Sequence, residues 1–167
     1  MTIPLADLFA QYHQSLVRML YRRTGDPDRA EEIAQEVFAR ATVAPPRNPR
    51  PWLFAVALNL VREQGRTETR RGRILELYRA EGPRHAPGPD QEVERTEKVE
   101  QVRSALATLT DRDREALLLK AEGFNYDEIA EALGLAKGAV GTTLARARQR
   151  LVAAYRQEEE RQRHAAS

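Results

Sequence analysis

The chain has 167 residues, which is enough for one ordinary domain or two small ones. Its composition, 41% hydrophobic and 31% charged with few aromatic side chains, is typical of a helical protein that folds in water. The formal net charge of +2 barely argues for nucleic acid, and the absence of cysteine excludes disulfides and thiolate metal sites. No apolar run approaches the roughly 20 residues needed to span a bilayer, and no secretory signal is visible. We therefore expect a cytoplasmic protein without membrane insertion.

Apolar residues at helical spacing predict a first helix over residues 5–23 and a second over 27–41. A Thr-Gly pair ends the first helix, and Asp26 followed by Pro27 is a start signal for the second. Acids near the start of a helix stabilise its dipole, so part of the acidic outer face has a local explanation. The remainder is either a solvated face or a docking surface for a basic partner. The polar residues of this outer face are Asp28, Glu31, Glu32, Gln35 and Glu36.

Residues 43–51 contain four prolines and are predicted to be a non-helical loop, which is either a plain connector or a functional element. Pro51 then starts a third helix, which is apolar nearly all round and is therefore expected to be mostly buried. Trp52 is interpreted as a core residue, with stacking on an unpaired base as the alternative. One stripe of this helix is polar and basic, and it consists of Asn59, Arg62 and Arg66.

Residues 81–90 contain three prolines, two glycines and no large aliphatic side chain, which predicts a linker. We therefore expect domains near 1–71 and 93–157, joined by a linker over 72–92. The polar end of the chain, residues 158–167, is predicted to be a disordered tail. Every periodic stretch has helical spacing and none alternates as a strand would. The predicted fold class is all-α: a three-helix domain and a four-helix domain joined by a flexible linker.

The most informative stretch, residues 124–155, predicts two helices joined by a tight turn. The first covers 126–133, and Gly134 follows it where a helix commonly ends in a left-handed conformation. From residue 132 to residue 157 there is no acid, so the second helix is strongly basic. This pattern is typical of a helix-turn-helix that meets DNA phosphates; the alternative is a helical hairpin with a solvated basic face. The candidate DNA contacts are Lys137, Ala139, Thr142, Thr143, Arg146, Arg148 and Arg150.

Within this set, the two threonines are short side chains that can bond several bases, so we expect them to touch base edges. We expect Lys137, Arg146 and Arg148 to supply charge rather than sequence preference.

Two stretches of the chain resemble bacterial sigma factors of the extracytoplasmic-function group. The first half resembles the family's second region through DPDRAEEIAQEVFARA followed by RPWLFAVALNLVRE. The second half resembles the family's fourth region almost end to end through LTDRDREALLLKAEGFNYDEIAEALGLAKGAVGTTLARARQRL. A helix-turn-helix alone is weak evidence, but both halves in this order, joined by a Pro/Gly linker, are a strong signal. The resemblance implies a transcription initiation factor rather than an enzyme, with no cofactor, no metal and no catalytic residues.

The resemblance also implies partners and residue roles. The acidic second helix is similar to the family helix that docks on the largest subunit of core RNA polymerase. Asn59, Arg62 and Arg66 match the family helix that faces the −10 element of promoter DNA. Arg47 and Arg50, in the loop before that helix, are further candidate contacts to this element. The second helix of the helix-turn-helix matches the reader of the −35 element in the major groove. Because family members are commonly held inactive by an anti-sigma factor, such a protein is an expected partner.

The chain departs from the family pattern in its recognition helix. Gly141, Thr142 and Thr143 stand where the family commonly has a basic residue, a serine and an arginine. Ala136 stands where a capping serine would hold the helix start better. These departures keep a second interpretation open, a sigma-like interaction protein that binds polymerase or a regulator without directing initiation. A nucleic-acid enzyme is disfavoured, because the three histidines are scattered and no metal-ligand spacing or paired carboxylates appear.

Overall fold

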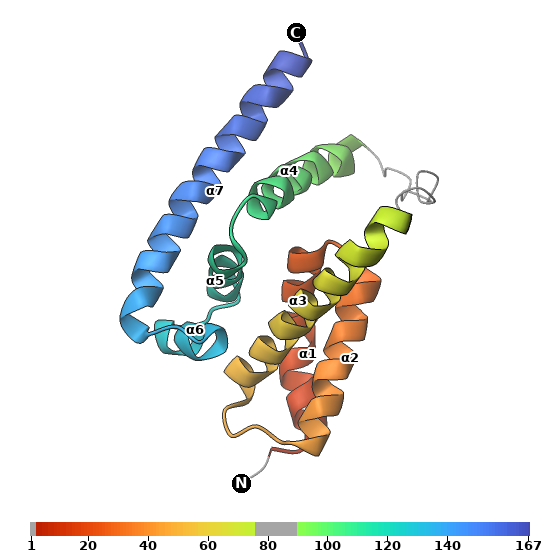
Figure 1. Ribbon diagram of the computed structural model, residues 1–167, viewed down its shortest axis with the longest axis vertical. Helices are drawn as coiled ribbons and strands as arrows, with labels where there is room; N and C mark the ends of the chain where they lie inside the picture. The colour runs from red at the N-terminus through yellow and green to blue at the C-terminus, as the bar shows by residue number, and fades with distance from the viewer. Residues whose placement is uncertain (1–2, 76–89) are drawn as a thin grey trace.

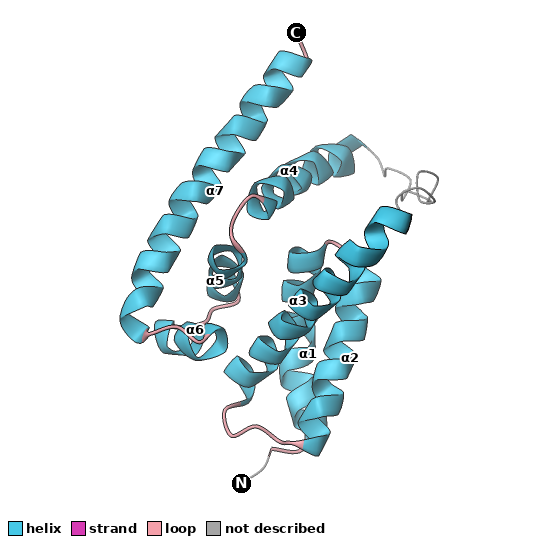
Figure 2. Cartoon of the chain, viewed as in Figure 1, coloured by secondary structure: helices cyan, strands magenta, loops and turns pink. Residues whose placement is uncertain are grey.

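The computed structural model describes residues 3–75 and 90–167, and it places side chains for 3–65 and 97–167. These residues form α-helices and, within the described ranges, no strand, which confirms the all-α class (Figures 1 and 2). We call α1–α3 the first bundle and α4–α7 the second bundle. The helices are α1 (Leu5–Thr24), α2 (Pro27–Val43), α3 (Pro49–Leu75), α4 (Asp90–Ala107), α5 (Asp111–Ala121), α6 (Tyr126–Leu133) and α7 (Lys137–Ala165). No helix of the described chain combines the length and the apolar character that crossing a bilayer requires.

The connection between α1 and α2 follows local sequence rules. Gly25 ends α1 with φ of 75°, a left-handed conformation that glycine adopts at little cost. The Asp26 carboxylate then accepts hydrogen bonds from the backbone N–H groups of Asp28 and Arg29, at 3.0 and 3.3 Å. These bonds satisfy donors that have no partner inside the helix. The predicted start of α2 is therefore confirmed.

The third helix begins earlier than predicted. The sequence predicts a start at Pro51, but α3 begins at Pro49. Prolines fit here because the first N–H groups of a helix have no intrahelical acceptor, so their loss costs little. The N–H of Trp52 reaches back to the Asn48 carbonyl at 3.4 Å. The Trp52 side chain is half-buried and packs against the core, which agrees with the core interpretation.

The helix-turn-helix matches the prediction closely. Asn125 caps α6 through its side-chain oxygen, which accepts from the Glu128 N–H at 2.8 Å, while the Glu128 carboxylate accepts from the Asn125 N–H at 3.1 Å. Gly134 ends α6 with φ of 67°. Ala136 precedes α7 and makes no side-chain cap, as the sequence implies. The predicted span of the first motif helix is confirmed.

The predicted disordered tail is wrong, because α7 continues to Ala165. Its last turns are rich in Glu, Gln and Arg, which have high helix propensity. The side chain of Gln162 bonds that of Gln101, so α7 lies along α4. The ends of the predicted linker, residues 72–75 and 90–92, are also helical, and the rest of it lies outside the described residues.

The two bundles share one hydrophobic core that sequence periodicity does not reveal. Phe54 of α3 and Phe124, between α5 and α6, are 1% and 0% exposed. Their rings meet edge to face, with centroids 4.8 Å apart. In Figure 1, α6 lies beside the start of α3, and the packing of α1 against α5 adds a second contact. The core cluster therefore runs through both bundles.

Candidate nucleic-acid interface

The acidic residues of α2 lie on one exposed face. Its opposite side is fully buried, including Ile33 and Val37 at 0% exposure. Glu36 pairs with Arg40 one turn later at 3.1 Å, and Glu31 lies 3.2 Å from the His13 ring nitrogen. This face can meet a cationic partner. The five residues predicted for it are all exposed: Asp28, Glu31, Glu32, Gln35 and Glu36.

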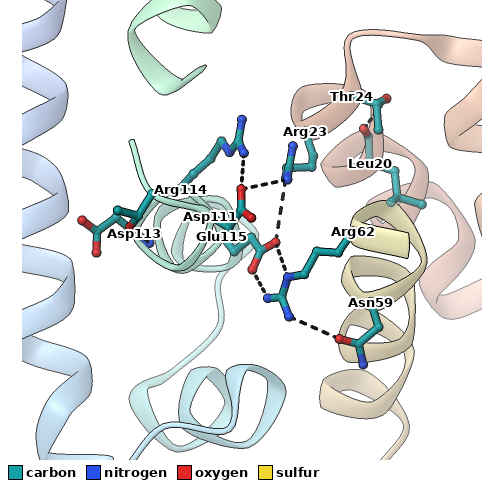
Figure 3. Close-up of polar contacts among 10 residues, drawn as sticks. Leu20, Arg23, Thr24, Asn59, Arg62, Asp111, Asp113, Arg114 and Glu115 are labelled. Atoms are coloured by element: carbon teal, nitrogen blue, oxygen red, sulfur yellow. Dashed lines mark hydrogen bonds and ion pairs between the residues drawn. The ribbon is translucent and has the colours of Figure 1, made fainter. Parts of the chain in front are cut away.

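One residue of the polar stripe of α3, Arg62, contacts the second bundle (Figure 3). The Arg62 guanidinium donates through Nε to Glu115 of α5 at 3.2 Å and through a second nitrogen to the other carboxylate oxygen. A third nitrogen donates to the Asn59 side-chain oxygen at 3.3 Å. The hydrogen bond to Glu115 raises the pKa of Arg62 above its ordinary value. Arg47 is exposed, and the side chain of Arg66 lies outside the described part of the chain.

Arg50, at the start of α3, also contacts the second bundle. It donates to the backbone carbonyl of Glu122 at 2.6 Å and lies 3.5 Å from the Glu128 carboxylate. Its guanidinium stacks 4.4 Å from the centre of the Phe124 ring, a cation–π contact. Two of the arginines predicted to face DNA, Arg50 and Arg62, are therefore engaged by the chain itself.

The acids that engage these arginines were missed by sequence reasoning. Glu115 is 0% exposed and belongs to the buried side of α5, together with Leu118 and Leu119. An acid on an otherwise apolar helix face is unusual unless it is paired, and that pattern could have identified it. The identity of its partner depends on how the bundles pack.

The basic helix α7 presents fewer DNA candidates than its sequence predicts. Thr143 is only 5% exposed, and its hydroxyl donates to the Ala139 carbonyl at 2.8 Å. The expectation that Thr143 lies on the exposed face is wrong, because it stands three residues after Val140 and four before Ala147, on the same buried side. Ala139 is partly buried. The candidates that remain exposed are Lys137, Thr142, Arg146, Arg148 and Arg150.

Two of these arginines donate hydrogen bonds to a buried acid of their own bundle. Asp113 of α5 is 0% exposed and accepts hydrogen bonds from Arg146 at 2.9 Å and Arg150 at 2.8 Å. Burial disfavours the charged carboxylate, but the hydrogen bonds and charges of the two arginines outweigh it and hold the pKa of Asp113 below its ordinary value. Arg148 makes no ion pair with any described residue, and Lys137 is 76% exposed. Among the candidate DNA contacts of α7, Lys137 and Arg148 are thus the cations most available to phosphate.

Replacing Asp113 with Asn should destabilise the second bundle by about 1–3 kcal/mol at neutral pH, since charge-assisted hydrogen bonds are lost. Because the folded-state pKa of Asp113 is depressed, its contribution is present above the ordinary carboxyl pKa and is lost as pH falls below about 4. The free energies of unfolding of the wild type and of Asp113→Asn, measured with urea, should therefore become equal in acid. Asp127→Asn, at a side chain that is 69% exposed, is the control and should change little. A difference in unfolding free energy between the two proteins that stays constant in acid would contradict the stabilising role of the Asp113 carboxylate.

Comparison with known proteins identifies both bundles. Residues 8–71 match the family described as Sigma-70 region 2, and residues 99–151 match Sigma-70, region 4. RNA polymerase sigma factor YlaC of Bacillus subtilis is 32% identical over 152 residues, which cover 86% of this chain and 87% of that protein. The chain belongs to the sigma-70 family of RNA polymerase sigma factors. The predicted resemblance is confirmed.

Further comparisons support the group within the family and the fold. ECF RNA polymerase sigma factor EcfG of Rhodopseudomonas palustris is 33% identical over 136 residues, covering 78% of this chain and 73% of that protein. This sigma factor therefore belongs to the extracytoplasmic-function group. The sigma factor RpoE of Bartonella quintana, solved in complex with the anti-sigma factor NepR, shares the fold with a TM-score of 0.61. That likeness covers 89% of this chain and 94% of RpoE at 24% identity.

Proposed function

We propose that this sigma factor binds core RNA polymerase through α2, the −10 element through α3 and the −35 element through α7. The observation that carries the proposal is a separation of charge between the two sigma regions. Region 2 presents the exposed acidic face of α2, and region 4 presents exposed cations on a helix that follows a helix-turn-helix turn. An acidic face suits a basic protein partner, and a basic helix suits phosphate. In this proposal the chain recognises the promoter, and the polymerase carries out RNA synthesis. We propose that the chain acts in the cytoplasm.

Run-off transcription tests this function directly. Core polymerase with and without the protein would be incubated with a library of genomic fragments from the source organism. We expect promoter-dependent transcripts only when the protein is present. Polymerase binding without any transcript would instead support the second candidate, a sigma-like interaction protein. That candidate is favoured by one observation: Asp113 engages Arg146 and Arg150, two of the four cations among the candidate DNA contacts of α7.

Reversing two charges on α2 should weaken the complex with core polymerase by about tenfold or more, because like charges would then face each other. The change is Glu32→Lys with Glu36→Lys, at side chains that are exposed and one turn apart. Affinity would be measured by titrating labelled protein with core enzyme. The control is Glu159→Lys with Glu160→Lys on α7, which changes the net charge equally. Equal affinity of both variants would show that α2 is not the docking surface.

An anti-sigma protein is the regulator that we propose for this chain. The proposal rests on membership of the group, and the related RpoE was solved with such a partner. Purification of the tagged protein from its own host at native levels should recover a stoichiometric inhibitor that blocks run-off transcription when added back. Repeated recovery of the sigma factor free of any inhibitor would count against this regulation.

A further inference from the structure

A polar cavity lies where helices of both bundles meet. Its volume is about 360 Å³, and its walls come from the end of α1, the first turn of α2, the middle of α3 and the start of α5. The described wall residues include three arginines, Arg23, Arg29 and Arg62, and one acid, Asp111. Ligand pockets commonly have volumes of about 300–1,000 Å³, so this cavity can hold a small molecule. Neither Arg23 nor Arg29 belongs to the surfaces proposed above for polymerase or promoter DNA.

The arginines at this cavity outnumber the carboxylates that pair with them. Asp111 accepts from Arg23 at 3.4 Å and from Arg114 at 2.7 Å. Glu115, with no exposed surface, accepts from Arg62 at 3.2 Å and lies 3.8 Å from Arg23. Figure 3 shows the three guanidiniums around these two carboxylates. Three positive charges are therefore shared between two negative ones.

Arg23 is a buried cation whose carboxylate partners satisfy it poorly. Its side chain is only 12% exposed, and its two ion pairs are long, at 3.4 and 3.8 Å. The buried Nε of Arg23 has no hydrogen-bond acceptor among the described residues. Burial, followed by the positive charge of Arg114, lowers the pKa of Arg23 below its ordinary value. A buried donor without an acceptor is costly, so an anion that accepts from Arg23 would stabilise the folded chain.

Phosphate is the anion that this arrangement suits best. The fork of N–H groups on arginine binds phosphate oxygens in pairs, and a tetrahedral phosphate presents oxygens to several guanidiniums at once. Three arginines and one aspartate give the described walls a formal charge of +2. This charge matches the roughly −1.5 to −2 of a phosphate monoester at neutral pH. A carboxylate carries one charge and a single plane of oxygens, so it matches both properties less well.

We propose that this cavity is a binding site for the phosphate group of a small molecule, either inorganic phosphate or a nucleotide. Arg23 and Arg29 hold the anion, and Arg62 contributes from α3. Val61 supplies apolar surface beside the arginines, on which the rest of a nucleotide can pack. The site goes beyond the proposed function, because it needs neither polymerase nor promoter. A ligand that binds only the folded chain stabilises it by mass action.

The first experiment measures thermal unfolding of the full chain with inorganic phosphate, ATP or chloride, all at one ionic strength and without added metal. At a hundredfold excess over its dissociation constant, the ligand should raise the melting temperature by about 5–10 °C above the chloride value. A shift with phosphate at least as large as that with ATP identifies the bare anion as the ligand, and a larger shift with ATP identifies a nucleotide. A melting temperature that follows ionic strength alone, whichever anion is present, overturns the proposal.

The second experiment locates the site by calorimetric titration of arginine variants with the probe that gave the larger shift. Arg23→Gln and Arg29→Gln should each weaken binding by about tenfold or more, because a charge-assisted hydrogen bond to the anion is lost. Arg22→Gln is the matched control: it removes the same charge from the neighbouring position on α1, where the side chain bonds Glu122 instead. Equal losses of affinity in Arg22→Gln and Arg23→Gln would show that net charge, and not the cavity, binds the anion.

A glycine in the cavity wall allows a test that leaves every charge in place. Gly65 of α3 lines the cavity, and a Cβ at this position would meet no described atom within 4 Å. Gly65→Leu should keep the wild-type helical spectrum, because leucine forms helices better than glycine does. Its side chain should fill part of the cavity, so the rise in melting temperature with the probe should be lost.

The control for this variant is Gly138→Leu on α7. Gly138 is exposed, and a Cβ there would also meet no described atom within 4 Å. The same substitution is thus made at equally open surroundings on a helix that does not line the cavity. Gly138→Leu should bind the probe as the wild type does. Wild-type affinity in a folded Gly65→Leu variant overturns the assignment of the site to this cavity.

Discussion

The Phe124→Ala variant is expected to lose about 3–5 kcal/mol of unfolding free energy. Phe124 is fully buried, meets Phe54 edge to face and lies under the Arg50 guanidinium. Truncation removes a large apolar side chain at the point where the bundles meet and leaves a cavity that surrounding helices cannot fill. For a chain of this length, each kcal/mol lowers the melting temperature by about 2–4 °C. The expected fall is thus about 6–20 °C, measured by thermal and urea unfolding.

An exposed phenylalanine gives the control for this prediction. Phe9 is 45% exposed and stacks on His13 at the surface, so Phe9→Ala should cost about 1 kcal/mol or less. A double-mutant cycle of Phe54→Ala and Phe124→Ala should give a coupling of about 0.5–1.5 kcal/mol, as for other aromatic pairs. Because these rings belong to different bundles, zero coupling would mean that the bundles do not pack together in solution.

Replacing both Lys137 and Arg148 with Ala should remove about two phosphate contacts from region 4. Each phosphate contact contributes about 0.9 to the slope of log affinity against log salt. Between about 50 and 200 mM salt, the wild type should therefore lose about 12 times more affinity for duplex DNA than the variant. The Lys137–Asp127 pair does not change this expectation, since both side chains are more than two-thirds exposed. The measurement is a fluorescence titration of a mixed-sequence duplex at several salt concentrations.

Arg146→Ala is the matched control for that pair. Its guanidinium bonds the buried Asp113, so its loss should lower the stability of region 4 and leave the salt slope close to that of the wild type. Thr142→Ala should change sequence preference with little change in slope, because a threonine hydroxyl carries no charge. If Arg146→Ala made the salt dependence of binding shallower and the Lys137/Arg148 double variant did not, Arg146 rather than Lys137 and Arg148 would be the phosphate contact.

The sequence by itself determined the features that depend on neighbours along the chain. Helical periodicity predicts every helix, Asp26 marks the start of α2, and Gly134 marks the end of α6. The acidic face of α2 could be predicted for the same reason, since one buried stripe defines the opposite side. The two sigma regions were recognisable because such local patterns recur in a fixed order.

Tertiary structure decided which partner each charged residue has. Arg62 and Arg146 look alike in the sequence, as basic residues on polar helix faces, yet one bonds Glu115 across the bundles and the other bonds Asp113 within region 4. Charge pairing depends on distances of a few ångströms between segments that are far apart in the chain, and periodicity contains no such information. Thr143 is buried for a related reason, because the width of a covered stripe depends on what packs against it. The bundle contact thus determines which of the predicted DNA residues are free.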